Sequence, residues 1–122
     1  MFRNEKGFTL IEIIAVLVIL GILAAVAIPK YISMMEQSRI SAAQAAIAEI
    51  KARSSNYYAS QMLSGGGATT GAAVQASVFA NSGVGSDFVL AATQSGSDIL
   101  ITVTTVKLNS IPATSGTWYY PT

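Results

Sequence analysis

The chain has 122 residues, of which 52% are hydrophobic and 11% charged, with a mean hydropathy of +0.52 and a formal net charge of +1. The length suits one domain, and the composition favours a membrane-tethered, assembling protein, because soluble domains carry about 25% charged residues. The absence of cysteine and histidine excludes the commonest zinc ligands, a cysteine nucleophile and a Ser-His catalytic pair. We therefore expect a protein that is not an enzyme and that holds no metal and no cofactor.

A long apolar segment near the N-terminus is the most specific feature of the chain. Residues 13–28 are all apolar, and as a helix together with residues 8–12 they would span about 31 Å, enough to cross the hydrocarbon core of a bilayer. Glu12 lies inside this segment, where an unpaired carboxylate costs about 2.5–3.5 kcal/mol. The glutamate therefore needs a positively charged partner.

A cut after Gly7 would create such a partner. It would place a new amine on Phe8, four residues before Glu12, and would remove the short charged leader of residues 1–7. The loss of Arg3, Glu5 and Lys6 would leave five basic and five acidic side chains, so that the processed chain carries no net side-chain charge. Neutrality permits identical subunits to pack closely and offers no basic stripe for nucleic acid.

The residues from Lys6 to Glu12, which read Lys-Gly-Phe-Thr-Leu-Ile-Glu, resemble the signature of the type IV pilin and type II secretion pseudopilin superfamily. This resemblance implies that an aspartyl prepilin peptidase cuts after Gly7 and methylates the amine of Phe8. It also implies that Glu12 pairs with the Phe8 amine of a neighbouring subunit during assembly. Gly21 and Pro29 match the positions of a helix-loosening glycine and proline in the family. The resemblance covers residues 1 to about 32.

Three other interpretations of the segment remain open. Ala25-Val26-Ala27 would serve as the cleavage site of an ordinary secretory signal peptide, although the apolar stretch is long and carries an acid near its start. The segment could also be a plain single-pass membrane anchor with Glu12 near the interface. A buried core helix is disfavoured, because sixteen uninterrupted apolar residues exceed what so short a chain can cover.

Beyond the apolar segment the pattern predicts an amphipathic continuation of the same helix to Leu63, before Ser64 and a run of glycines. We expect a kink or local unwinding between Gly21 and Pro29. One apolar stripe follows at helical spacing, formed by Ile40, Ala43, Ile47, Ile50 and Tyr57. A helix over residues 8–63 would be about 84 Å long, so that it must protrude from the rest of the chain.

The remaining residues predict a small head. Residues 64–83 are rich in Gly, Ala, Ser and Thr and are interpreted as a loosely packed surface loop with at most one or two helical turns. Residues 88–93 and 99–106 predict two strands joined by a turn at 94–97, and 117–120 a third strand after a turn at 112–116. The expected fold class is α+β, in which a kinked helix protrudes from a small antiparallel sheet, the ladle shape of pilins.

The head offers only weak candidate sites. Asp87 and Asp98 could hold calcium, as some secretion pseudopilins do nearby, but solvated strand ends are the simpler interpretation. The aromatic residues Tyr57, Tyr58, Trp118, Tyr119 and Tyr120 could stack on bases or pass electrons, but core and interface packing is the simpler interpretation. Glycans on Ser and Thr of residues 64–77 have no distinguishing signal. Many pilins close this region with a disulfide, which a chain without cysteine cannot form.

The functional hypothesis is a structural subunit of a type IV pilus that serves adhesion, motility or DNA uptake. Three segments are expected: leader 1–7, transmembrane and filament-core helix 8–29, and amphipathic helix with β head 30–122. The expected partners are identical subunits, prepilin peptidase, membrane lipid and an inner-membrane assembly platform with its ATPase, with no specific nucleic acid. The precursor would cross the inner membrane once with its head outside the cytoplasm. The alternatives are a periplasmic type II secretion major pseudopilin and a membrane-anchored binding module that forms no filament.

Overall fold

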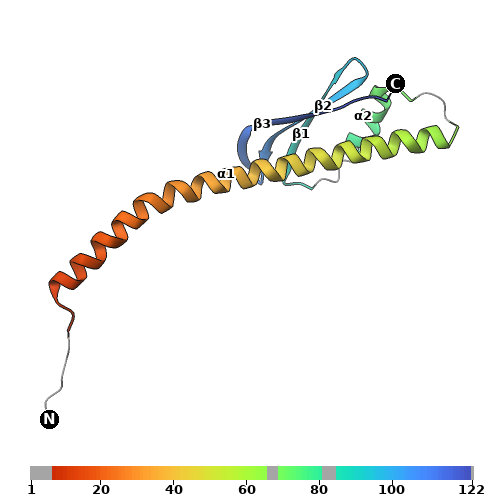
Figure 1. Ribbon diagram of the computed structural model, residues 1–122. Helices are drawn as coiled ribbons and strands as arrows, with labels where there is room; N and C mark the ends of the chain where they lie inside the picture. The colour runs from red at the N-terminus through yellow and green to blue at the C-terminus, as the bar shows by residue number, and fades with distance from the viewer. Residues whose placement is uncertain (1–6, 66–68, 81–84, 122) are drawn as a thin grey trace, which may run out of the picture. The chain divides into compact units, whose positions relative to one another are not determined.

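The computed structural model describes residues 7–65, 69–80 and 85–121, and most of the leader therefore lies outside the described residues. The chain divides into two compact units, Met1–Met35 and Glu36–Thr122. The helix α1, Leu10–Leu63, contributes residues to both units. The second unit also holds α2, Gly71–Ala80, and the strands β1, Phe88–Ser95, β2, Asp98–Val106, and β3, Asn109–Trp118 (Figure 1).

The first helix confirms the prediction of a long N-terminal helix. It starts at Leu10 instead of Phe8 and ends at Leu63. Residues 21–29 are helical throughout and include Pro29, which lacks the N–H that would bond one turn back. Of the described residues, only α1 is long and apolar enough to cross a membrane. The helix loosening expected at Gly21 and Pro29 stays a prediction.

The three strands form an antiparallel sheet in the order β1-β2-β3 (Figure 1). Phe88 pairs with Val106 and Ser95 with Asp98 across β1 and β2, while Ile99 pairs with Trp118 across β2 and β3. The first two strands confirm the predicted pair. The side chains of β2 alternate between buried and half-buried along most of its length, as expected for a strand with one face on the core.

The third strand differs from the prediction. It begins at Asn109, and the turn before it consists of Lys107 and Leu108, so that the residues predicted as a turn, 112–116, lie inside β3. Proline is tolerated there because β3 is an edge strand and its register with β2 is irregular opposite Thr104. Lys107 and Leu108 carry none of the usual turn chemistry, which is why the sequence did not reveal this turn.

The interpretation of residues 64–83 as a loose surface loop was wrong for their central part. Residues 71–80 form α2, whose hydroxyl cap is Thr70 and whose buried side chains are Val74 and Val78. Residues 66–68 and 81–84 lie outside the described residues. Gly71 is buried, and a Cβ there would clash with the carbonyl of Ser97, so that α2 begins directly against the β1–β2 turn.

The core of the second unit lies between the two helices and the sheet. The predicted stripe on α1 supplies Ala43, Ile47 and Ile50 to it, while Ile40 and Tyr57 are half-buried. Ser54 is also fully buried and donates its hydroxyl to the carbonyl of Ile50 at 2.9 Å. The other buried apolar residues of this core cluster are Val74, Val78, Ile99, Ile101, Val103, Val106, Ile111 and Trp118. The stripe therefore covers one face of the sheet, as its spacing predicted.

Candidate functional site

The start of α1 is built by two reciprocal hydrogen bonds between Thr9 and Glu12. The backbone N–H of Thr9 donates to Oε2 of Glu12 at 2.7 Å, and the backbone N–H of Glu12 donates to Oγ1 of Thr9 at 3.3 Å. This arrangement is a capping box, in which two backbone donors that lack helical partners are satisfied by side chains. Helix α1 therefore starts at Leu10 and leaves Gly7 and Phe8 outside it.

The capping box also lowers the free-energy cost of placing the charge of Glu12 in an apolar segment. The carboxylate already accepts a hydrogen bond within its own chain, and it lies in the first turn of a helix, where the helix dipole favours negative charge. Part of the cost of placing it in an apolar segment is thereby offset before any partner arrives. Sequence reasoning missed this role, although Thr-x-x-Glu before an apolar run is the known signature of a capping box.

The residues predicted for cleavage, methylation and register lie together at this end of the first unit. The side chain of Phe8 is 85% exposed, and the space around the α-carbon of Gly7 is open. An apolar concavity of about 490 Å³ adjoins them and is lined by Phe8, Glu12, Ile13, Val16 and Leu17. The bond between Gly7 and Phe8 therefore lies in an exposed, non-helical segment that a protease can reach.

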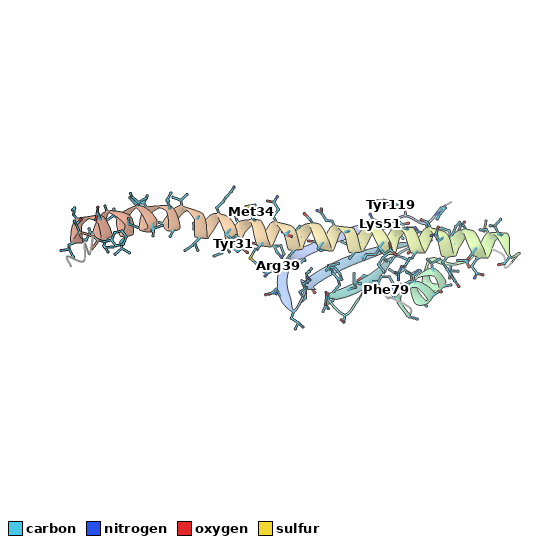
Figure 2. All side chains as sticks on the ribbon, turned by 90° about the horizontal axis from the view of Figure 1, so that it is seen from below. Tyr31, Met34, Arg39, Lys51, Phe79 and Tyr119 are labelled. Atoms are coloured by element: carbon cyan, nitrogen blue, oxygen red, sulfur yellow. The ribbon has the colours of Figure 1, made fainter. Side chains whose placement is uncertain are left out.

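The rest of the first unit exposes apolar side chains on all sides of α1 (Figure 2). None of its described residues is buried, including Gly21 and Pro29. Among those exposed are Leu10, Ile11, Ile14, Val16, Leu17, Val18, Ile19, Leu20, Ile22, Leu23, Val26, Ile28, Tyr31, Ile32 and Met34. A helix that is apolar all round is stable only in lipid or among other helices. This surface thus requires a membrane or an assembly.

The C-terminal end of the head is held by aromatic side chains. Trp118 is 5% exposed and donates its indole N–H to Oγ of Ser55 at 3.0 Å. Its ring meets those of Tyr58 and Tyr120 edge-on, with centroids 6.4 and 6.1 Å away. The backbone N–H of Tyr120 donates to Oδ1 of Asp98 at 2.8 Å. These contacts hold residues 118–120 against the rest of the head without a disulfide.

The same contacts show what surrounds the aspartates and aromatic residues that were weak candidate sites in the head. Packing accounts for Trp118, Tyr58 and Tyr120, and Asp98 accepts the N–H of Tyr120. Asp87 is exposed beside the β2–β3 turn, where its carbonyl accepts the N–H of Lys107 at 2.6 Å. The two aspartates thus have different surroundings, and among the described residues no group of three acids gathers that could hold a metal.

Tyr120 makes the stability of the head sensitive to alkaline pH. Burial raises the pKa of its hydroxyl, and the nearby Tyr58 raises this pKa further. The hydroxyl also donates to the carbonyl of Thr69, a bond that the ionised form cannot make. The pKa of Tyr120 in the folded state therefore lies above its unfolded value of about 10. The stability that its neutral hydroxyl contributes is fully present below pH 10 and is lost as the pH rises through the folded-state pKa.

We expect Tyr120→Phe to weaken this dependence. The free energy of unfolding of the wild type should fall as the pH rises above about 10, because the hydroxyl of Tyr120 ionises more readily in the unfolded chain, and the variant should lack that part of the pH dependence. Urea unfolding of the full chain in detergent, followed from pH 8 to 11.5, measures it. Tyr119→Phe is the control, because Tyr119 is 73% exposed. Equal slopes for Tyr120→Phe and wild type would contradict the expectation.

A capped apolar helix joined to a small antiparallel sheet defines the class of fold as pilin-like α+β. Comparison with known families agrees with this class. Residues 2–28 match the model of the prokaryotic N-terminal methylation motif. No solved structure matches the chain.

Individual proteins similar to this chain are pilins and a pseudopilin. The type II secretion system core protein G of Pseudomonas aeruginosa is 48% identical over 50 residues, which are 41% of this chain and 35% of that protein. The type IV major fimbrial protein FimA of Dichelobacter nodosus is 54% identical over 37 residues, 30% of this chain and 24% of that protein. The type IV narrow pilus major component PilA5 of Thermus thermophilus is 40% identical over 48 residues, 39% of this chain and 41% of that protein.

The N-terminal segment of the chain is thus similar to proteins of the type IV pilin and pseudopilin superfamily. The matched part of the chain spans about a quarter to two fifths of the length of these relatives. The similarity to these proteins therefore rests on the N-terminal segment.

Proposed function

We propose that this chain is a structural, non-enzymatic subunit of a type IV pilus. The observation that carries the proposal is the exposed apolar first unit, which begins with the capped Glu12 and matches the methylation motif. Two of the relatives described above are named as major components of type IV fimbriae or pili. Pilin and pseudopilin relatives imply self-assembly into filaments and processing by a prepilin peptidase.

Processing would proceed at the exposed end of the first unit. Prepilin peptidase would cut between Gly7 and Phe8 and methylate the new amine, while α1 anchors the precursor in the inner membrane with the head outside the cytoplasm. An assembly platform and its ATPase would then extract the subunit. The helix would lose lipid contacts and regain similar ones from neighbouring helices, since both surroundings are apolar.

Within the filament, Glu12 would set the axial register. The methylated amine of Phe8 on one subunit would approach the carboxylate of Glu12 on its neighbour. Only one axial offset pairs both charges, and every other offset leaves them apart in apolar surroundings. Loosening of the helix between Gly21 and Pro29 would allow the apolar segment to adjust to its neighbours.

A second candidate function is that of a major pseudopilin of type II secretion. The match to the secretion core protein G favours it. The two functions share processing and helix packing and differ in the length and place of the filament, which is an extracellular fibre in one case and a short periplasmic one in the other.

Intact mass and N-terminal analysis of material sheared from the native cells tests the proposal. We expect a methylated Phe8 start in the sheared fibres. The same start confined to the envelope fraction would favour the pseudopilin. An uncut Met1 or a start at Ile28 would contradict both candidates, because it would show a membrane anchor or an ordinary signal peptide.

A further inference from the structure

The turn between β2 and β3 holds an exposed leucine in an unfavourable backbone conformation. Lys107 and Leu108 have φ values of 50° and 62°, and they link the paired residues Val106 and Asn109. Two-residue turns with positive φ at both positions favour Asn-Gly, because a bulky side chain is strained there. The side chain of Leu108 is nevertheless 94% exposed. The isolated subunit thus gains nothing from leucine at this position.

A groove with both apolar and polar lining residues lies elsewhere on the same unit, between α1 and β3. It has a volume of about 210 Å³ and is lined by Gln44, Ile47, Ala48, Lys51, Ser115 and Gly116. Gly116 lies close to the helix, since a Cβ there would come within 2.7 Å of Cγ2 of Ile47. Lys51 lies on α1 alongside the sheet (Figure 2). Because a water occupies about 30 Å³, the groove has room for a leucine side chain.

We infer that Leu108 of one subunit inserts into this groove on a second copy of the chain, a contact that rests on the proposed function and specifies one of its interfaces. Insertion would bury Leu108 against Ile47 and Ala48. Charge complementarity supports the same partner. Asp87 lies beside the leucine turn, Lys51 lines the groove, and among the described residues neither has an ion-pair partner.

The leucine turn and the groove are different parts of one unit, so that the contact can join the subunits into an extended array. When it is made once between two copies it is heterologous, and the pair keeps one free turn and one free groove for further copies, whereas a two-fold dimer would fill both. Such contacts propagate into open helical arrays unless the rotation between subunits closes a ring.

Two substitutions test the contact from its two sides. Leu108→Gly relieves the backbone strain and removes the inserted side chain, so that the melting temperature of the full chain should rise by a few degrees while filament yield falls about tenfold. Ala48→Leu fills the groove with a residue that favours helix, and should cause a similar loss of filaments without lowering the melting temperature. Leu63→Gly and Ala59→Leu are the controls, since Leu63 is 89% exposed and neither residue lines the groove.

Disulfide cross-linking tests the contact directly, because the chain has no native cysteine. Leu108→Cys combined with Ala48→Cys, oxidised in native cells, should give a ladder of multimers that collapses on reduction. Each single variant lacks the second cysteine of this contact, so that it should give no ladder and at most a dimer. The readout serves for extracellular and periplasmic filaments alike.

The outcomes separate this inference from the proposed function. Wild-type filaments with a Phe8 start, together with normal filament yield from Leu108→Gly and Ala48→Leu, would overturn the inferred contact and leave the proposed function standing. A cross-linked band at monomer mass would also overturn it, because the residues would then meet within one chain. A wild-type chain that forms no filament in any fraction would overturn both.

Discussion

Trp118→Ala is expected to remove a large part of the stability of the head. Trp118 is the last residue of β3 and the only tryptophan in the sequence; its side chain is 5% exposed and contacts both α1 and Tyr120. Truncation of a buried tryptophan costs about 3–5 kcal/mol, and it also leaves Ser55 without its indole donor. Since small domains are stable by about 5–15 kcal/mol, the head of the variant should unfold at a much lower urea concentration than the wild type.

Urea unfolding of the full chain in detergent, followed by circular dichroism, measures this loss. Trp118→Phe should retain part of the stability, because it keeps a ring against Tyr58 and Tyr120 but loses the indole N–H. The control is Tyr119→Ala, which removes an exposed neighbour and should change the free energy of unfolding by less than about 0.5 kcal/mol. A loss below about 1 kcal/mol for Trp118→Ala would show that the aromatic cluster does not hold the chain end.

Glu12→Ala and Glu12→Gln are expected to abolish filament assembly while leaving processing after Gly7 intact. Either change would leave the Phe8 amine of the neighbour without its carboxylate in apolar surroundings, and breaking a buried charge pair costs about 3–5 kcal/mol. The loss recurs at every subunit contact. Cleavage should persist because the bond between Gly7 and Phe8 lies outside the helix in an exposed segment.

The two variants separate the charge of Glu12 from its capping role. Glutamine keeps an oxygen that can accept the backbone N–H of Thr9, whereas alanine loses it. Both should fail to assemble, but only Glu12→Ala should speed amide hydrogen exchange in the first turn of α1. Glu36→Gln, on an exposed acid of the same helix, is the control. Filaments of normal number and length from Glu12→Gln would show that the charge does not set the register.

The N-terminal part of the molecule was predictable because its determinants are local. A helix bonds each residue to one four positions away, so that the apolar run and the stripe of Ala43, Ile47 and Ile50 were sufficient to predict α1 and its buried face. The residues from Lys6 to Glu12 are contiguous and matched a known motif without any tertiary information. The start at Leu10 was also encoded locally by Thr9 and Glu12.

The head was predictable only in part because its structure depends on pairing between distant residues. The alternating apolar residues of β2 predicted a strand. Lys107 and Leu108 are not typical turn residues, so that the turn they form was not predicted. Pro112 and Gly116 favoured a turn, although both lie inside β3. The tertiary structure tolerates them because β3 is an edge strand with an irregular register and because Gly116 approaches Ile47.

The sequence by itself determined the long helix, its apolar surface, its charged residue and the processing motif, since each depends on neighbours within a few positions. Tertiary structure alone decided that α2 packs against the β1–β2 turn, that aromatic rings hold the chain end, and that an exposed leucine and a groove occupy different surfaces of one head. The physical reason is that these features join residues far apart in the sequence, such as Gly71 with Ser97 and Ile47 with Gly116, whose pairing follows from the packing of the whole unit.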